Sequence, residues 1–162
     1  PLAACRQPAA PAQPAGGPAA AQTAAQTAAA PEAYAPGLGE IMTLQQMRHT
    51  KLWFAGQAGN WKLAAYEIEE LQEGFDDVVT FHPTHKDAPV APKDAIPRMV
   101  TEPLKALAAV VDKGDAAAFP AAFDALTAKC NACHDAMEFG FNKVQRPAVN
   151  PYPNQIFTPA RP

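Results

Sequence analysis

The pentapeptide Cys130-Asn131-Ala132-Cys133-His134 constrains this chain more than any other feature of its sequence. Residues i, i+3 and i+4 share one face of a helix, so the two thiols and the imidazole would point the same way. This CxxCH pattern is typical of haem c attachment, in which each thiol forms a thioether to a haem vinyl group and the histidine binds the iron. The sequence therefore predicts one covalently attached haem.

Two other chemistries use the same residues. Zinc is bound by Cys and His, but a structural zinc site needs a fourth ligand, for which His82 and His85 in a proline-rich loop are the candidates. A disulfide between Cys130 and Cys133 is the second alternative, although cysteines within one helical turn have poor disulfide geometry. The sequence contains no second CxxC or HxxxH pattern, so the haem interpretation is favoured.

Apolar residues recur at helical spacing in four segments, and no alternating strand pattern competes with them. We expect helices over about residues 38–56, 60–80, 95–112 and 115–143. The third is expected to kink or break near Thr101, because Pro103 cannot donate a backbone hydrogen bond. The haem motif falls within the apolar stripe of the last helix. Short connections between amphipathic helices favour an all-α fold, an antiparallel four-helix bundle with the haem against its interior.

The two ends of the chain have a different composition. Residues 1–36 are rich in proline and alanine, and Arg6 and Glu32 are their charged residues. A segment with so few large apolar side chains cannot offset the entropy lost on ordering, so it is predicted to be a disordered linker. The proline-rich residues 147–162 are predicted to form an extended tail. Residues 37–146 then form the folded cytochrome domain.

The third cysteine lies near the start of the sequence. Leu2-Ala3-Ala4-Cys5 resembles the lipobox of bacterial lipoproteins, in which the cysteine receives a lipid. The resemblance implies a membrane anchor at Cys5, with the linker carrying the domain near the membrane surface. Covalent haem attachment also implies export, so we expect the periplasmic side of a bacterial membrane. Arg6 rather than Asp follows Cys5, which favours the outer membrane. The alternative is an unmodified cysteine in a low-complexity segment.

The overall charge and hydropathy exclude other classes of protein. The formal net charge is −3, and no basic run suggests binding to nucleic acid. No stretch approaches 18 consecutive apolar residues, so no transmembrane helix is predicted.

The order of the helices and the position of the CxxCH motif near the end of the last one resemble the cytochrome c prime family, the class II c-type cytochromes. The resemblance covers about residues 38–144 and implies that His134 is the proximal iron ligand. Low-spin members place a methionine of the first helix on the other side of the iron and transfer electrons. Met42 lies in that early turn and is the preferred distal ligand; Met47 and His49 are the alternatives.

Other members of that family leave the sixth iron position open and bind gases such as NO and CO. The family usually has an aromatic residue three positions after the haem histidine and a basic residue at the fourth. This chain has Met137 and Glu138 there, which indicates a divergent member and weakens the analogy to gas binding. The family resemblance also implies a homodimer.

We therefore expect a membrane-tethered c-type cytochrome that passes single electrons to and from a redox partner protein and is not an enzyme. A five-coordinate gas-binding protein is the alternative. A peroxidase would need a distal acid-base pair, for which His49 and Glu40 are the candidates. Arg48, Lys51 and Arg98 could pair with haem propionates. The acidic residues Glu67, Glu69, Glu70 and Glu73 are expected to form a solvated face, or a docking surface for a basic redox partner.

Overall fold

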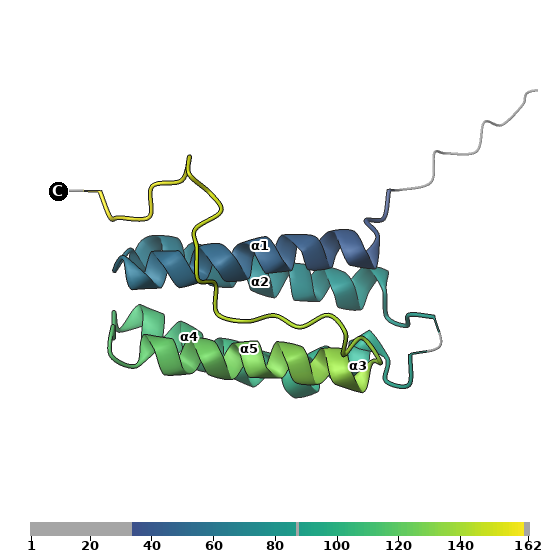
Figure 1. Ribbon diagram of the computed structural model, residues 1–162. Helices are drawn as coiled ribbons and strands as arrows, with labels where there is room; N and C mark the ends of the chain where they lie inside the picture. Colours follow the sequence, from purple (N-terminus) through teal and green to yellow (C-terminus); the bar gives the residue numbers. More distant parts are fainter. Residues whose placement is uncertain (1–33, 87, 161–162) are drawn as a thin grey trace, which may run out of the picture. The chain divides into compact units, whose positions relative to one another are not determined.

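The computed structural model describes residues 34–86 and 88–160, and within these ranges it contains five α-helices and no strand. The helices are α1 (Leu38–Gln57), α2 (Trp61–Phe81), α3 (Pro92–Met99), α4 (Thr101–Asp112) and α5 (Phe119–Ala136) (Figure 1). The predicted all-α fold is confirmed. None of the helices in these ranges has both the length and the apolar character needed to cross a membrane.

The first two helices begin at local caps. The carboxylate of Glu40, in the first turn of α1, accepts a hydrogen bond from the Gly37 amide at 3.3 Å and another from the Tyr34 hydroxyl at 2.7 Å. The Asn60 side chain accepts from the Leu63 amide at 3.2 Å and so caps the start of α2. The tight turn between α1 and α2 requires a positive φ of 68° at Gly59.

The third predicted helix is two helices in the structure. Val100 separates α3 from α4, which confirms the break expected near Thr101, and the two helices follow one another end to end (Figure 1). The start was placed too late, however: α3 begins at Pro92 rather than near residue 95. Proline suits the first helical position, where its missing amide hydrogen would have no intrahelical partner.

The last helix is shorter than predicted at both ends. At its start, the Asp115 carboxylate accepts from the amides of Ala117 and Ala118 in a turn that precedes α5. At its end, the amide of Phe139 donates to the carbonyl of His134 at 2.7 Å, and Glu138 takes a positive φ of 65°. This pair of features is a Schellman motif, which ends a helix with a left-handed residue. The extension of the helix to residue 143 was therefore wrong.

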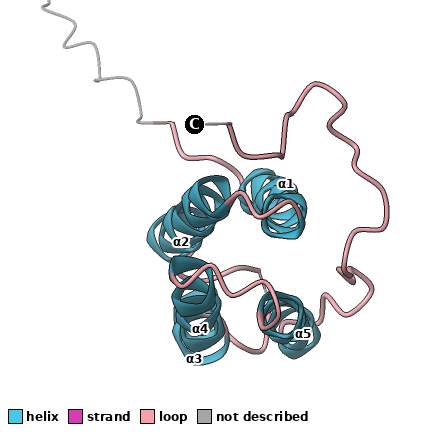
Figure 2. Cartoon of the chain, turned by 90° about the vertical axis from the view of Figure 1, so that its left-hand side faces the viewer, coloured by secondary structure: helices cyan, strands magenta, loops and turns pink. Residues whose placement is uncertain are grey.

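Helices α1 and α2 pack along one another, and α5 packs along α3 and α4. Viewed end-on, α1 and α5 face each other across a wider separation than these neighbours (Figure 2). Aromatic contacts join them toward the end of α1, where the Trp53 ring lies 5.0 Å from that of Phe123 and 5.9 Å from that of Phe119, measured between ring centroids. His49, earlier in α1, contacts Thr127, whereas Trp53, later in α1, contacts the earlier α5 residues Phe119 and Phe123, so the two helices run antiparallel.

After α5 the chain continues without regular secondary structure to residue 160. Phe157 is buried and its ring lies 5.7 Å from that of Phe54 on α1. The Tyr152 ring lies beneath the ammonium group of Lys51, 5.6 Å away. The extended C-terminal segment is thus packed on α1 by aromatic contacts.

Candidate haem site

A cavity of about 330 Å³ opens among α1, α2, α3 and α5, within the size range of small-molecule sites. Cys130, Cys133 and His134 all line it from α5, and Met42 and His49 line it from α1. Most of the remaining lining is apolar, from side chains that include Leu71, Phe75, Val78, Ile96, Val100 and Leu126. The structure thus brings the three motif residues, Met42 and His49 to one cavity, and its mostly apolar walls suit a flat, largely apolar ring.

The imidazole of His134 is oriented by the chain that follows α5. Its Nδ1 lies 2.6 Å from the backbone carbonyl oxygen of Asn142. A carbonyl can only accept, so Nδ1 carries the hydrogen, and in the neutral ring Nε2 then keeps its lone pair. Metal-bound histidines are commonly held in this way, because the hydrogen bond fixes both tautomer and ring orientation. The arrangement leaves Nε2 of His134 free to bind an iron.

Asn131, inside the CxxCH motif, holds that following chain in place. Its side-chain amide donates to the carbonyl of Val144 at 2.8 Å, and its side-chain oxygen accepts from the Val144 amide at 2.9 Å. Lys143 also pairs with Asp135 on α5. The chain after the Schellman motif is therefore pinned back against α5, with the Asn142 carbonyl directed at His134.

The two motif thiols lie in an apolar environment. Burial raises the pKa of Cys130 to about 12, with a smaller contribution from neighbouring Cys133. Burial also raises the pKa of Cys133, whose sulfur lies 3.9 Å from that of Met137. Both side chains are therefore protonated thiols at neutral pH, and they are not bonded to each other. Redox-active and catalytic cysteines have the opposite property, a lowered pKa beside positive charge.

The register of α1 against α5 places Met42 opposite His134. Nε2 of His49 lies 2.8 Å from the hydroxyl oxygen of Thr127, which sets those two residues at one level. Met42 precedes His49 by seven residues, and His134 follows Thr127 by seven. In antiparallel helices both steps run toward the same end, and each covers two turns, about 10.5 Å. Met42 and His134 therefore face one another across the cavity.

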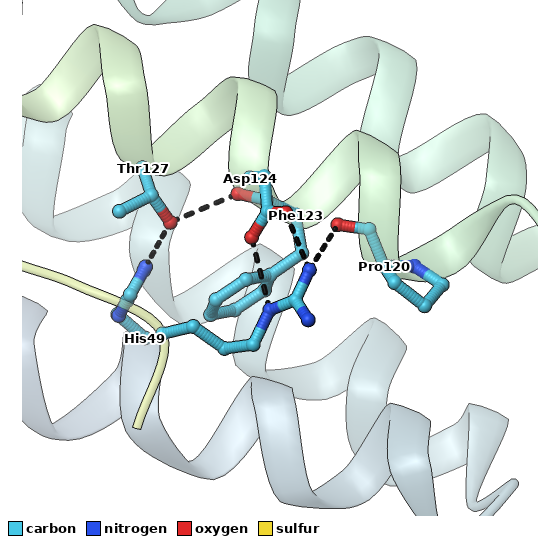
Figure 3. Close-up of polar contacts among 6 residues, drawn as sticks. His49, Pro120, Phe123, Asp124 and Thr127 are labelled. Atoms are coloured by element: carbon cyan, nitrogen blue, oxygen red, sulfur yellow. Dashed lines mark hydrogen bonds and ion pairs between the residues drawn. The ribbon is translucent and has the colours of Figure 1, made fainter. Parts of the chain in front are cut away.

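His49 is held inside the protein by a short chain of hydrogen bonds (Figure 3). The Thr127 hydroxyl donates to the Phe123 carbonyl at 2.9 Å, so it can only accept from His49, whose Nε2 carries the hydrogen. The His49 ring packs on the Phe123 ring at 4.4 Å between centroids. Burial lowers the pKa of His49 to about 4, so the ring is neutral near pH 7. His49 lies two turns from the level of His134.

The alternative residues are placed less favourably. Met47 is not among the cavity-lining residues. Glu40, the proposed acid partner of His49, caps the start of α1 at the surface, so the structure does not assemble a distal acid-base pair from these two residues. Phe141, which falls within the predicted span of the last helix, lies beyond the observed end of α5 and is 84% exposed.

The ligands of a zinc site are not assembled in the part of the chain that the structure describes. No group of three His, Cys, Asp or Glu side chains there is arranged to hold a metal ion. His85 does line the cavity described above, where its ring lies 5.8 Å from that of Phe139, measured between centroids. Nε2 of His82 instead donates to the Pro36 carbonyl at 2.7 Å.

Charged residues between α1 and α2 serve the packing of these helices. Arg48 donates to the Glu70 carboxylate and to the Gln45 side chain, both at 2.9 Å, so neither it nor Glu70 is a free surface charge. Glu67 is 3% exposed, and its burial raises its pKa, an effect that Lys51 partly offsets. The expected solvated acidic face was therefore wrong for Glu67, which lies in the interface.

Comparison of the chain with known protein families, curated proteins and solved structures found no match. The resemblance to the cytochrome c prime family thus depends on the haem motif and on helix order. Cys5, the predicted lipidation site, lies outside the described residues.

Proposed function

We propose that this protein is a c-type cytochrome that transfers single electrons through one haem bound to Cys130, Cys133 and His134. The observation that carries the proposal is the meeting of these three residues with Met42 at one apolar cavity, where Nε2 of His134 is left free. When bound, the haem supplies an iron that alternates between its ferrous and ferric states. Each thiol would add its S–H across one haem vinyl group, which consumes both thiols.

The chain's own residues account for the properties that electron transfer requires. The Asn142 carbonyl and the Asn131 clamp keep His134 in one orientation. The thioether of Met42 would complete the coordination from α1, and a methionine ligand raises the reduction potential relative to a second histidine. Apolar walls exclude water and disfavour the more highly charged ferric state, which raises the potential further.

The architecture that fits this function is an antiparallel four-helix bundle. In it, α3 and α4 together form the third member, interrupted at Val100, beside α1, α2 and α5. A lipid at Cys5 and the linker after it would tether the domain on the periplasmic side of a membrane, with the outer membrane favoured. The tether would raise the effective concentration of a membrane-bound redox partner.

Mass spectrometry tests the covalent haem. The full chain is produced in a bacterium that carries a cytochrome c maturation system, and its mass is measured under denaturing conditions. We expect the mass of one haem to remain attached, and to be lost when Cys130 and Cys133 are both replaced by alanine. A chain that matures in these cells without any attached haem would refute the proposal.

Optical spectra of two methionine variants test the distal ligand. Met42→Ala should abolish the weak far-red band of methionine-ligated ferric haem and should allow the ferrous protein to bind CO. Met47→Ala is the matched control, since Met47 is on the same helix but does not line the cavity. If Met42→Ala matches the parent spectrum, Met42 is not the ligand. A high-spin parent that binds CO readily would instead indicate gas binding.

A further inference from the structure

The two helices that carry the proposed iron ligands are the first and last of the domain, and they are not closely packed partners. Helix α1 packs on α2, whereas α5 packs on α3 and α4 (Figure 2). The distance between Met42 and His134 therefore depends on whatever links α1 to α5 directly. One such link is the His49–Thr127 hydrogen bond, together with the aromatic contacts of Trp53.

Arg146 provides a second link, from the chain that follows α5. Its guanidinium carbon lies 4.5 Å from the centroid of the Trp53 ring on α1, in cation–π geometry. On α5, its Nε donates to Oδ1 of Asp124 at 3.0 Å, its Nη2 pairs with Oδ2 of the same carboxylate, and Nη2 also reaches the Pro120 carbonyl at 3.4 Å (Figure 3). One side chain thus joins the two helices by a paired ionic contact and a ring contact.

The link lies far enough from the proposed iron ligands for a small rotation at the link to move Met42 appreciably. Trp53 follows Met42 by 11 residues on α1, and Asp124 precedes His134 by ten on α5, so the link lies about 15 Å from the proposed ligands along both helices. With a lever of about 15 Å, a rotation of roughly 4° at the link displaces Met42 by ~1 Å. A displacement of that size is large compared with the tolerance of a metal–ligand bond.

The same chain segment also orients the proximal ligand. Asn142, four residues before Arg146, directs its carbonyl at His134, and Val144 between them is held by Asn131. The segment 142–146 therefore contacts His134 at one end and clamps α1 to α5 at the other. The position of one ligand and the orientation of the other depend on the same short stretch of chain.

We propose that Arg146 is a positioning residue, which clamps α1 to α5 through Trp53 and Asp124 and thereby holds Met42 on the iron. This inference rests on the proposed function, because it requires a haem with Met42 as the sixth ligand. Arg146 touches neither the haem nor its ligands in this role. Loss of the clamp lets the cavity end of α1 move away from α5, so Met42 leaves the iron more often.

The rate at which CO binds the ferrous protein measures that opening. Arg146→Gln and Asp124→Asn each remove the ionic part of the clamp, and each should raise the CO association rate about two- to fivefold, the factor that corresponds to ~0.4–1 kcal/mol for an ion pair of this exposure. The double variant should be no faster than either single variant, because the two residues act through one contact. The far-red band of the ferric protein should weaken in all three. Lys105→Gln is the control, since it breaks an ion pair with Glu102 within α4.

A purely structural role predicts a different pattern. The Arg146 and Asp124 variants would then unfold at lower denaturant concentration, while their CO association rates and far-red bands would equal those of the parent. That result would overturn the positioning role. The parent spectrum reports separately on the proposed function: a high-spin parent removes Met42 from the iron, whereas a low-spin parent with unresponsive variants overturns the clamp alone.

Discussion

The burial of His49 predicts a loss of stability in acid that one substitution should remove. The folded protein holds this ring neutral, because burial lowers its pKa from 6.5 to about 4. Unfolding exposes the ring, which then binds a proton more readily. The unfolded state is therefore favoured as the pH falls below 6.5, and stability that is fully present above that value is lost progressively down to about pH 4.

The size of this loss follows from the two pKa values. A ring with a pKa of 6.5 unfolded and about 4 folded contributes a difference of about 3 kcal/mol between pH 7 and pH 4. In His49→Leu the group is absent, so its stability should fall by about 3 kcal/mol less than that of the parent over the same range. Other titrating groups are common to both proteins and cancel in the comparison.

Urea unfolding of the haem-loaded protein, followed by far-ultraviolet circular dichroism at pH 7 and pH 4, measures the difference. Thr127→Val is a paired variant that leaves His49 buried but removes its hydrogen-bond acceptor. It should be about 1–3 kcal/mol less stable than the parent at pH 7. Its loss between pH 7 and pH 4 should nevertheless resemble that of the parent. Equal acid losses in His49→Leu and the parent would refute the reasoning.

Three further substitutions, one of them with a control, test the local structure of the domain. Glu138→Gly should raise the free energy of unfolding by roughly 0.5–1 kcal/mol, because glycine adopts the positive φ of this position without strain. A thermal melt measures this change, and an unchanged melting temperature would show that the glutamate backbone is not strained. Gly56→Ala should lower the free energy of unfolding by about 1–3 kcal/mol in a denaturant titration, since the added Cβ would lie 2.1 Å from the Phe119 ring. Gly39→Ala is its control and should not destabilise the protein, because the added Cβ would have no atom within 4 Å. Asn131→Ala should cost about 1–2 kcal/mol and broaden the proton resonances of the His134 ring by releasing the segment that orients it; an unchanged ring spectrum would contradict that role.

Local patterns in the sequence predicted much of the helical structure. The spacing of apolar residues placed α1 and α2 within about a residue of their observed bounds, and the cap of α2 is Asn60, a residue type that commonly caps helices. The break between α3 and α4 followed from the lack of an amide hydrogen at Pro103. These features depend on interactions between residues a few positions apart, which a sequence displays directly.

The end of α5 was not evident from the sequence. The apolar spacing continues past Met137, so periodicity alone favoured a helix to residue 143. The helix ends at Ala136 because Glu138 adopts a left-handed conformation and Asn131 binds the backbone of Val144. A glycine at position 138 would have indicated a helix end, because glycine commonly adopts the left-handed conformation there. Glutamate gives no such indication, since the strain of its backbone is offset by contacts with residues distant in sequence.

The sequence by itself placed two thiols and an imidazole on one face of a helix, because that geometry depends only on their spacing. The tertiary structure determined which other groups lie around these three side chains. The Asn142 carbonyl fixes the tautomer of His134, and the His49–Thr127 contact sets the register that brings Met42 to the opposite side of the cavity. Both depend on how separate segments pack, and packing between segments has no signature in local spacing.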